Sequence, residues 1–151
     1  MNSNWYNGTT RVSEFRFIRF VRDLAALRSF YEEIFDWPIV DQWDEGVMYD
    51  TGGVILELIQ NLAADKPNGS SYISLSILDV SSLFQLLENK VTIISPLTQN
   101  SWGDTSFQMS DPDGFFITFF TPTLKSPEEK IRCIAGYLPE MYTKDTLEKL
   151  L

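Results

Sequence analysis

The chain has 151 residues, of which 44% are hydrophobic and 22% charged, a composition typical of one globular domain with a buried core. Twelve basic and twenty-one acidic residues give a net charge of −9, which argues against nonspecific binding to nucleic acid or to an anionic membrane. No apolar run reaches the roughly 18 residues that span a bilayer, and the N-terminus lacks a secretory signal pattern. The only cysteine is Cys133. We therefore expect a soluble cytoplasmic protein without an intramolecular disulfide.

The first half of the chain alternates between strand and helix patterns. Residues 13–22 are rich in phenylalanine and β-branched residues and predict a strand. Asp23 then predicts the N-cap of a helix over LAALRSFYEEIFD, whose apolar residues have helical spacing. Three short strands are predicted to follow at about 38–43, 46–50 and 54–60, separated by glycine-containing turns.

The same order of elements follows a polar linker at 61–70. YISLSILDV predicts a strand, and SSLFQLLENK predicts a helix that Ser81 or Ser82 could cap. VTIIS predicts a strand and PLTQNSWG a loop. DTSFQMS and FFITFFTP predict two further strands, joined by the tight turn DPDG.

The two halves can be superposed on two anchors. Asp23 of FVRDL aligns with Asp79 of SILDV, and Asp50 of YDTGG aligns with Asp111 of SDPDG. We therefore expect a duplicated strand–helix–three-strand unit, with modules at about 13–60 and 71–122. Residues 1–12 form a separate N-terminal segment, and residues 123–151 a C-terminal extension with helices at about 127–136 and 140–150.

Three strings in this order carry a family resemblance: FVRDLAALRSFYEEIFDWPIV, GVILELIQ and WGDTSFQMSDPDGFFITFF. On a duplicated βαβββ unit they resemble the glyoxalase/bleomycin-resistance/extradiol dioxygenase (vicinal oxygen chelate) superfamily, over about residues 13–122. The resemblance implies an α+β fold in which two βαβββ modules form curved mixed sheets around a cleft. Asp36 departs from it, because relatives usually have glycine after the first helix.

The resemblance also places four metal-ligand positions of metal-dependent relatives, at Arg16, Glu57, Tyr72 and Thr118. The chain has no histidine, the commonest transition-metal ligand and the residue on which Ser-His-Asp and Cys-His sites depend. Arginine has no lone pair to donate, and neutral tyrosine and threonine hydroxyls are poor ligands. Glu57 alone cannot complete a site, so we expect no metal and no cofactor.

Strand alternation assigns two faces to each predicted sheet. Beside the four positions above, the cleft face includes Ile18, Phe20, Ile55, Ile59, Ser74, Ser76, Phe116 and Phe120. The opposite face is apolar and should lie under the helices, although Arg19 interrupts it in the first strand. Trp43 and Trp102 lie in polar turn contexts and are candidates for the rim of the cleft.

Arg16 and Glu57 should therefore face one cleft and interact. They are either a buried ion pair that neutralises two charges or a ligand-binding pair, and Glu57 is at best a weak candidate for a catalytic base. The expected ligand-binding residues are Arg16, Glu57, Tyr72, Thr118, Phe20, Phe116, Trp43 and Trp102.

The function that we expect is metal-independent binding of a small, partly aromatic molecule, of the resistance or sequestration type. Two alternatives remain open from the sequence. One is a lyase, isomerase or dioxygenase of the same superfamily that uses a metal or Glu57. The other is an assembly domain with a vestigial cleft. The expected partners are a small-molecule ligand and a second copy of the chain in a homodimer, but neither nucleic acid nor a membrane.

Overall fold

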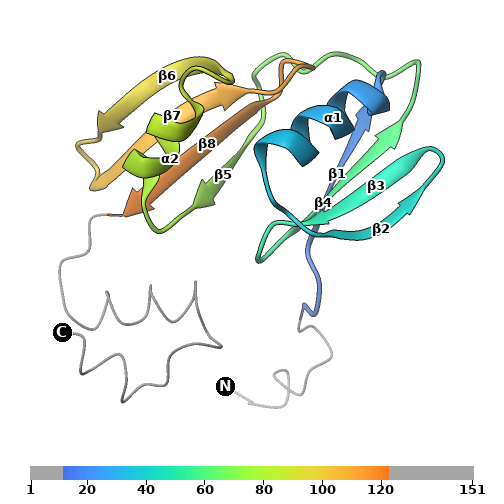
Figure 1. Ribbon diagram of the computed structural model, residues 1–151, viewed down its shortest axis with the longest axis horizontal. Coiled ribbons are helices and arrows are strands. Elements are labelled where there is room, and N and C mark those ends of the chain that lie inside the picture. Colours follow the sequence, from blue (N-terminus) through green and yellow to red (C-terminus); the bar gives the residue numbers. More distant parts are fainter. Residues whose placement is uncertain (1–11, 123–151) are drawn as a thin grey trace, which may run out of the picture. The chain divides into compact units, whose positions relative to one another are not determined.

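Each half of the chain folds into a four-stranded sheet with one helix packed on it (Figure 1). The computed structural model describes residues 12–122. The helices predicted at about 127–136 and 140–150 lie outside the described residues. The chain divides into two units between Asp65 and Lys66, inside the predicted linker.

The first unit has the strand order β1-β4-β3-β2. β1 pairs with β4 in parallel, and the other two pairings are antiparallel. The helix α1 connects β1 to β2 at the opposite edge of the sheet. Its elements are β1 (Arg16–Val21), α1 (Leu24–Ile34), β2 (Ile39–Trp43), β3 (Gly46–Asp50) and β4 (Ile55–Gln60).

The second unit repeats this arrangement with the order β5-β8-β7-β6, in which β5 and β8 are parallel. The predicted α+β fold with two βαβββ modules is thereby confirmed. The elements of the second unit are β5 (Tyr72–Ser76), α2 (Val80–Leu87), β6 (Thr92–Gln99), β7 (Asp104–Ser110) and β8 (Phe116–Pro122). Within residues 12–122 no helix is long and apolar enough to cross a membrane.

The sequence prediction was wrong about the length of β6. PLTQ was expected to be loop, but the strand continues through Pro96 to Gln99. Proline lacks the N–H that a central strand must donate, and β6 accommodates it because the strand lies at the edge of its sheet. Two register shifts against β7, between Ile93 and Ser95 and between Ser95 and Thr98, accompany it.

Both helices begin at an aspartate. Asp23 Oδ1 accepts a hydrogen bond from Ala26 N at 3.0 Å, as predicted for α1. For α2 the N-cap is Asp79, whose carboxylate accepts from the N–H of Ser82 at 3.1 Å and from its hydroxyl at 2.7 Å. The prediction of Ser81 or Ser82 as the cap was therefore wrong, and the true cap is the residue that aligns with Asp23 in the repeat.

The second anchor of the repeat is a turn of the same kind in each unit, formed at Asp50 and at Asp111. Asp50 Oδ1 accepts from Gly52 N at 2.8 Å, and Asp111 Oδ1 accepts from Asp113 N at 2.9 Å and from Phe115 N at 3.0 Å. An aspartate side chain that bonds the backbone two residues ahead stabilises a tight turn. In each unit this turn delivers the chain into the strand that lies beside the first strand of its sheet.

Apolar side chains under the helices form the core of each unit. In the first sheet Val21, Leu56 and Leu58 are no more than 1% exposed, and in the second Phe107, Met109 and Ile117 are equally buried. Arg19 also lies on the helix-covered face, with 7% exposure, and its Nη1 donates to the Tyr31 hydroxyl of α1 at 3.5 Å. The face predicted for the first strand is therefore correct despite Arg19.

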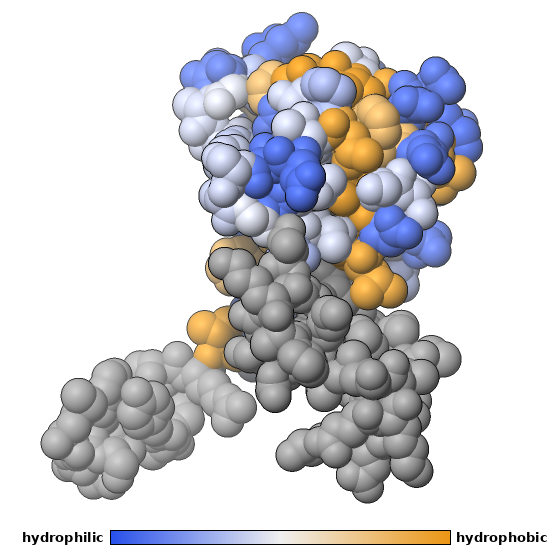
Figure 2. Space-filling view, turned by 90° about the vertical axis from the view of Figure 1, so that its left-hand side faces the viewer, coloured by the Kyte–Doolittle hydropathy of each residue, from blue (hydrophilic) through white to orange (hydrophobic). Residues whose placement is uncertain are grey.

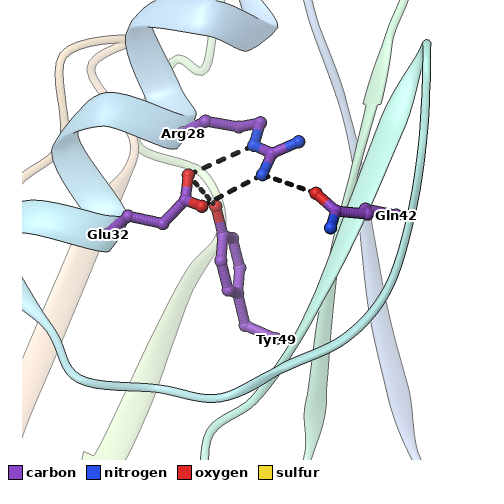
Figure 3. Close-up of polar contacts among 4 residues, drawn as sticks. All are labelled: Arg28, Glu32, Gln42 and Tyr49. Carbon is purple, nitrogen blue, oxygen red and sulfur yellow. Dashed lines mark hydrogen bonds and ion pairs between the residues drawn. The ribbon is translucent and has the colours of Figure 1, made fainter.

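A polar clamp, made of Arg28, Glu32, Gln42 and Tyr49, joins α1 to strands β2 and β3 (Figure 3). The Arg28 guanidinium donates two hydrogen bonds to Glu32, at 3.1 and 3.0 Å, and a third to Gln42 Oε1 at 2.9 Å. The Tyr49 hydroxyl donates to Glu32 Oε2 at 3.1 Å. The clamp adds charge-assisted hydrogen bonds to the apolar contacts that hold the helix on the sheet.

The clamp shifts the ionisation of its members. Hydrogen bonds from Arg28 and Tyr49 lower the pKa of Glu32, against a smaller opposing effect of burial. Burial, with the nearby Glu32 charge, raises the pKa of Tyr49 above its usual range, so the phenol remains a donor at neutral pH.

We predict that Glu32→Gln lowers the free energy of unfolding at pH 7 and has little effect at pH 3. A carboxylate whose pKa is lowered by folding stabilises the protein above its ordinary pKa of 4.5, and that contribution is lost as the pH falls through the lower folded value. Urea unfolding from pH 7 to pH 3 measures this. Glu33→Gln, at the neighbouring exposed carboxylate, is the matched control, and an equal pH dependence in both variants would contradict the prediction.

Candidate functional site

The face of the first sheet turned away from α1, called here the open face, has a register fixed by strand pairing. Phe20, Ile59, Gly46 and Trp43 form one row across the four strands. Ile18, Glu57, Met48 and Asp41 form the next row. Arg16 begins the third row, beside Ile55. The open face is thus mainly apolar, with Glu57 on its central strand β4.

Glu57 is buried and only partly paired. Its side chain is 9% exposed, and its Oε2 lies 3.7 Å from Arg16 Nη1. The predicted interaction of Arg16 with Glu57 is therefore present, as an ion pair longer than a hydrogen bond. Within the described residues no hydrogen-bond donor reaches Glu57 Oε2.

Arg16 has a second acidic partner that the sequence analysis did not identify. Its Nε donates to Glu14 Oε2 at 2.9 Å, and the Arg16 side chain remains 44% exposed. The pKa of Arg16 is raised, first by the hydrogen bond and charge of Glu14 and to a smaller extent by Glu57. The shorter contact and the larger effect both indicate that Glu14 is the stronger partner of this guanidinium.

Trp43 lies against the backbone of β3. A Cβ atom added to Gly46 would come within 2.1 Å of the Trp43 ring, so the indole covers the position that a side chain would occupy there. Trp43 remains 39% exposed, and in the same row Phe20 is 54% exposed. Gly46 therefore leaves room for the Trp43 ring on the open face.

The second sheet also has an open face, which is the face turned away from α2. Strand pairing arranges its residues in rows across β5, β8, β7 and β6, and the three central rows contain no charged residue. Tyr72 pairs with Phe116, and Ser74 with Thr118. Gln108 lies opposite Thr118 on β7, and its Nε2 donates to Thr118 Oγ1 at 3.0 Å. The rows are completed by one aromatic residue and six hydroxyl residues: Phe120, Ser76, Ser106, Thr98, Ser95, Ser110 and Thr92.

The structure thus divides the predicted site residues into three sets. Arg16, Glu57, Phe20 and Trp43 share the open face of the first sheet. Tyr72, Phe116 and Thr118 share that of the second. Trp102 lies in the hairpin between β6 and β7, where it is 76% exposed.

Sequence reasoning missed Glu14, Gly46, Met48 and Gln108. Alternation of DTSFQMS could have placed Gln108 beside Thr118. No sequence signal places the Trp43 ring on Gly46, because that contact depends on pairing between strands.

The residues present do not fit the metal that the resemblance would imply. Glu57 is the one carboxylate among the four positions and lies 3.7 Å from the Arg16 guanidinium, which has no lone pair to donate, so the three or four ligands of a metal site are not supplied. The Thr118 hydroxyl already accepts a hydrogen bond from Gln108. Within residues 12–122 no group of three or more His, Cys, Asp or Glu side chains is arranged to hold a metal ion.

Comparison with known proteins identifies relatives of the fold. The family model of the Glyoxalase/Bleomycin resistance protein/Dioxygenase superfamily matches residues 15–119. No curated protein matches the chain significantly.

Solved structures share the fold at low sequence identity. A protein of unknown function from Agrobacterium tumefaciens is 23% identical, with a TM-score of 0.64, and the match covers 74% of this chain and 95% of that one. The bleomycin resistance determinant encoded on the transposon Tn5 is 20% identical, with a TM-score of 0.61 and coverage of 75% and 100%. TioX from Micromonospora is 18% identical, with a TM-score of 0.60 and the same coverage.

We predict that Gly46→Ala displaces the Trp43 ring and destabilises the fold by about 1–3 kcal/mol, the usual effect of overpacking. The indole N–H signal of Trp43 should move in ¹H–¹⁵N spectra, and the urea midpoint should fall. Gly53→Ala is the matched control, because its added Cβ would meet nothing within 4 Å. An unchanged Trp43 signal in Gly46→Ala would contradict the described packing.

Proposed function

Because the chain belongs to the glyoxalase/bleomycin resistance protein/dioxygenase superfamily, we propose that it is a binding protein of that superfamily which works without a metal. Its ligand is a small, partly aromatic molecule, held on the open face of the first sheet and sequestered rather than transformed. One relative in fold, the determinant encoded on Tn5, is described as a bleomycin resistance determinant, which is a function of this type.

The observation that carries the proposal is the pairing of Glu57 with Arg16. The one carboxylate among the four positions given by the resemblance faces a guanidinium at 3.7 Å. A carboxylate with a guanidinium at the next position does not supply the ligands of a metal site, and it leaves a polar pair that can orient a ligand by hydrogen bonds.

The surroundings of this pair suit an aromatic ligand. Ile18, Phe20 and Trp43 are large apolar side chains that remain 39–54% exposed on the open face of the first sheet. An apolar surface that contains a few polar groups is the usual composition of a small-molecule site. Exposed aromatic rings contribute both contact area and stacking energy to such a ligand.

We predict that screening with small aromatic compounds identifies ligands that raise the melting temperature. Trp43→Ala should weaken their binding at least about tenfold, because loss of an aromatic anchor costs more than about 1.4 kcal/mol. Calorimetric titration measures the dissociation constants. Leu62→Ala is the control, because Leu62 is 79% exposed beyond the end of β4 and lies outside the rows of the open face.

Zinc, nickel or manganese should neither raise the melting temperature nor copurify with the chain. About one tightly bound metal ion per chain by elemental analysis would overturn the proposed function, and it would favour a metal-dependent enzyme instead.

We also propose that the protein is a homodimer. The sheet orders leave β1 and β2 at the edges of the first sheet and β5 and β6 at the edges of the second, and unpaired edges invite pairing.

Exposed apolar residues of the second unit give a further argument for the dimer. Leu78 and Leu86 of the second unit are more than half exposed. Figure 2, which views the left-hand side of Figure 1, shows hydrophobic residues reaching the surface between hydrophilic ones. Such exposed apolar surface suits an interface between copies.

We predict that light scattering at micromolar concentration gives twice the 17.4 kDa of the chain. The mass should not change with salt if apolar contacts and strand pairing hold the dimer together. A mass of one chain throughout the concentration range would contradict the dimer while leaving the ligand-binding proposal intact.

A further inference from the structure

We propose that the open face of the first sheet selects a cationic ligand, in which a flat aromatic group carries an amidinium- or guanidinium-type N–H donor that binds Glu57. The inference rests on the proposed function of the same face and adds the chemical class of the ligand.

The first argument is the unsatisfied acceptor. Glu57 Oε2 is buried, accepts no hydrogen bond within the described residues, and has only the Arg16 guanidinium nearby, at 3.7 Å. A buried acceptor without a donor is unfavourable, and donation by a ligand removes that penalty. Ile18 beside Glu57 is 49% exposed and the Arg16 side chain 44% exposed, so movement of either gives a donor access.

The second argument is the charge of the cluster. Arg16 is shared between Glu14, at 2.9 Å, and Glu57, at 3.7 Å. One cation between two carboxylates leaves one negative charge in the cluster. Because Arg16 makes its hydrogen bond to Glu14, the excess negative charge lies at Glu57. The cluster should therefore attract a cation and repel an anion.

The third argument is the aromatic surface beside the carboxylate. Gly46 and Glu57 are diagonal corners of a four-residue patch whose other corners are Met48 and Ile59. This diagonal spans about 8 Å, given the usual strand spacing and rise per residue. The Trp43 ring lies on the Gly46 corner.

A flat ring that stacks on Trp43 and passes over Met48 and Ile59 therefore points its substituent at Glu57. A planar amidinium donates two parallel N–H bonds to a carboxylate, which an ammonium ion cannot do with the same geometry. The charge also interacts favourably with the face of the tryptophan ring.

Three probes of nearly identical shape test the inference: benzamidine, benzamide and benzoate. Binding to the full chain is followed through the indole N–H signal of Trp43, assigned by its loss in Trp43→Phe. We expect benzamidine to bind at least tenfold more tightly than benzamide, and benzoate most weakly.

Two substitutions should act in opposite directions. Glu57→Gln should remove the preference for benzamidine over benzamide. Arg16→Gln should strengthen benzamidine binding several-fold, because it removes the competing cation. The matched controls are Glu88→Gln and Lys90→Gln, which make the same charge changes at exposed positions after α2 and should alter binding by less than twofold.

The outcomes separate this inference from the proposed function. Equal binding of all three probes, or tightest binding of benzoate, overturns the cationic selection while the face remains a ligand site. Failure of all three probes, where other aromatic compounds bind at Trp43, also overturns it. If no aromatic compound perturbs the Trp43 signal, the proposed function fails as well. Should Glu57→Gln not fold, the sign of the Arg16→Gln effect still decides.

Discussion

The alternation of side chains along each strand is the constraint on which both the core and the candidate site depend. On β4, Leu56 and Leu58 are almost completely buried under α1, and Glu57 between them points to the open face. A shift of one residue would place the carboxylate under the helix and two leucines on the open face. The apolar pattern that stabilises the core therefore also fixes the position of Glu57.

The two buried charges of the first sheet show how each face accommodates a polar group. Arg19 lies on the helix-covered face, and one of its partners is the Tyr31 hydroxyl of α1. Glu57 lies on the open face, where Oε2 accepts no hydrogen bond within the described residues. The covered face thus supplies a donor or acceptor from its own helix. On the open face, no helix among the described residues of the first unit supplies such a donor.

Most of the fold could be predicted from the sequence because its signals are local or repeated. Strand alternation and helix spacing gave the order of elements, and the Asp50 and Asp111 turns confirm the duplication. The errors occurred where local propensity allowed two answers. Serine and aspartate are equally good N-caps, so the choice of Asp79 required the alignment with Asp23. Pro96 predicted a loop because proline is excluded from central strands. Only the sheet order shows that β6 is an edge strand, where proline is tolerated.

The candidate site could be predicted only in part, because its decisive contacts cross between strands or depend on side-chain direction. Alternation was sufficient to bring Arg16 and Glu57 to one face, and by charge alone that pair is neutral. The structure adds Glu14, which accepts the Arg16 hydrogen bond, and Gly46, which accommodates the Trp43 ring. Glu14 makes the net charge of the cluster negative, since two carboxylates now share one guanidinium. This net negative charge is the basis of the proposed preference for a cationic ligand.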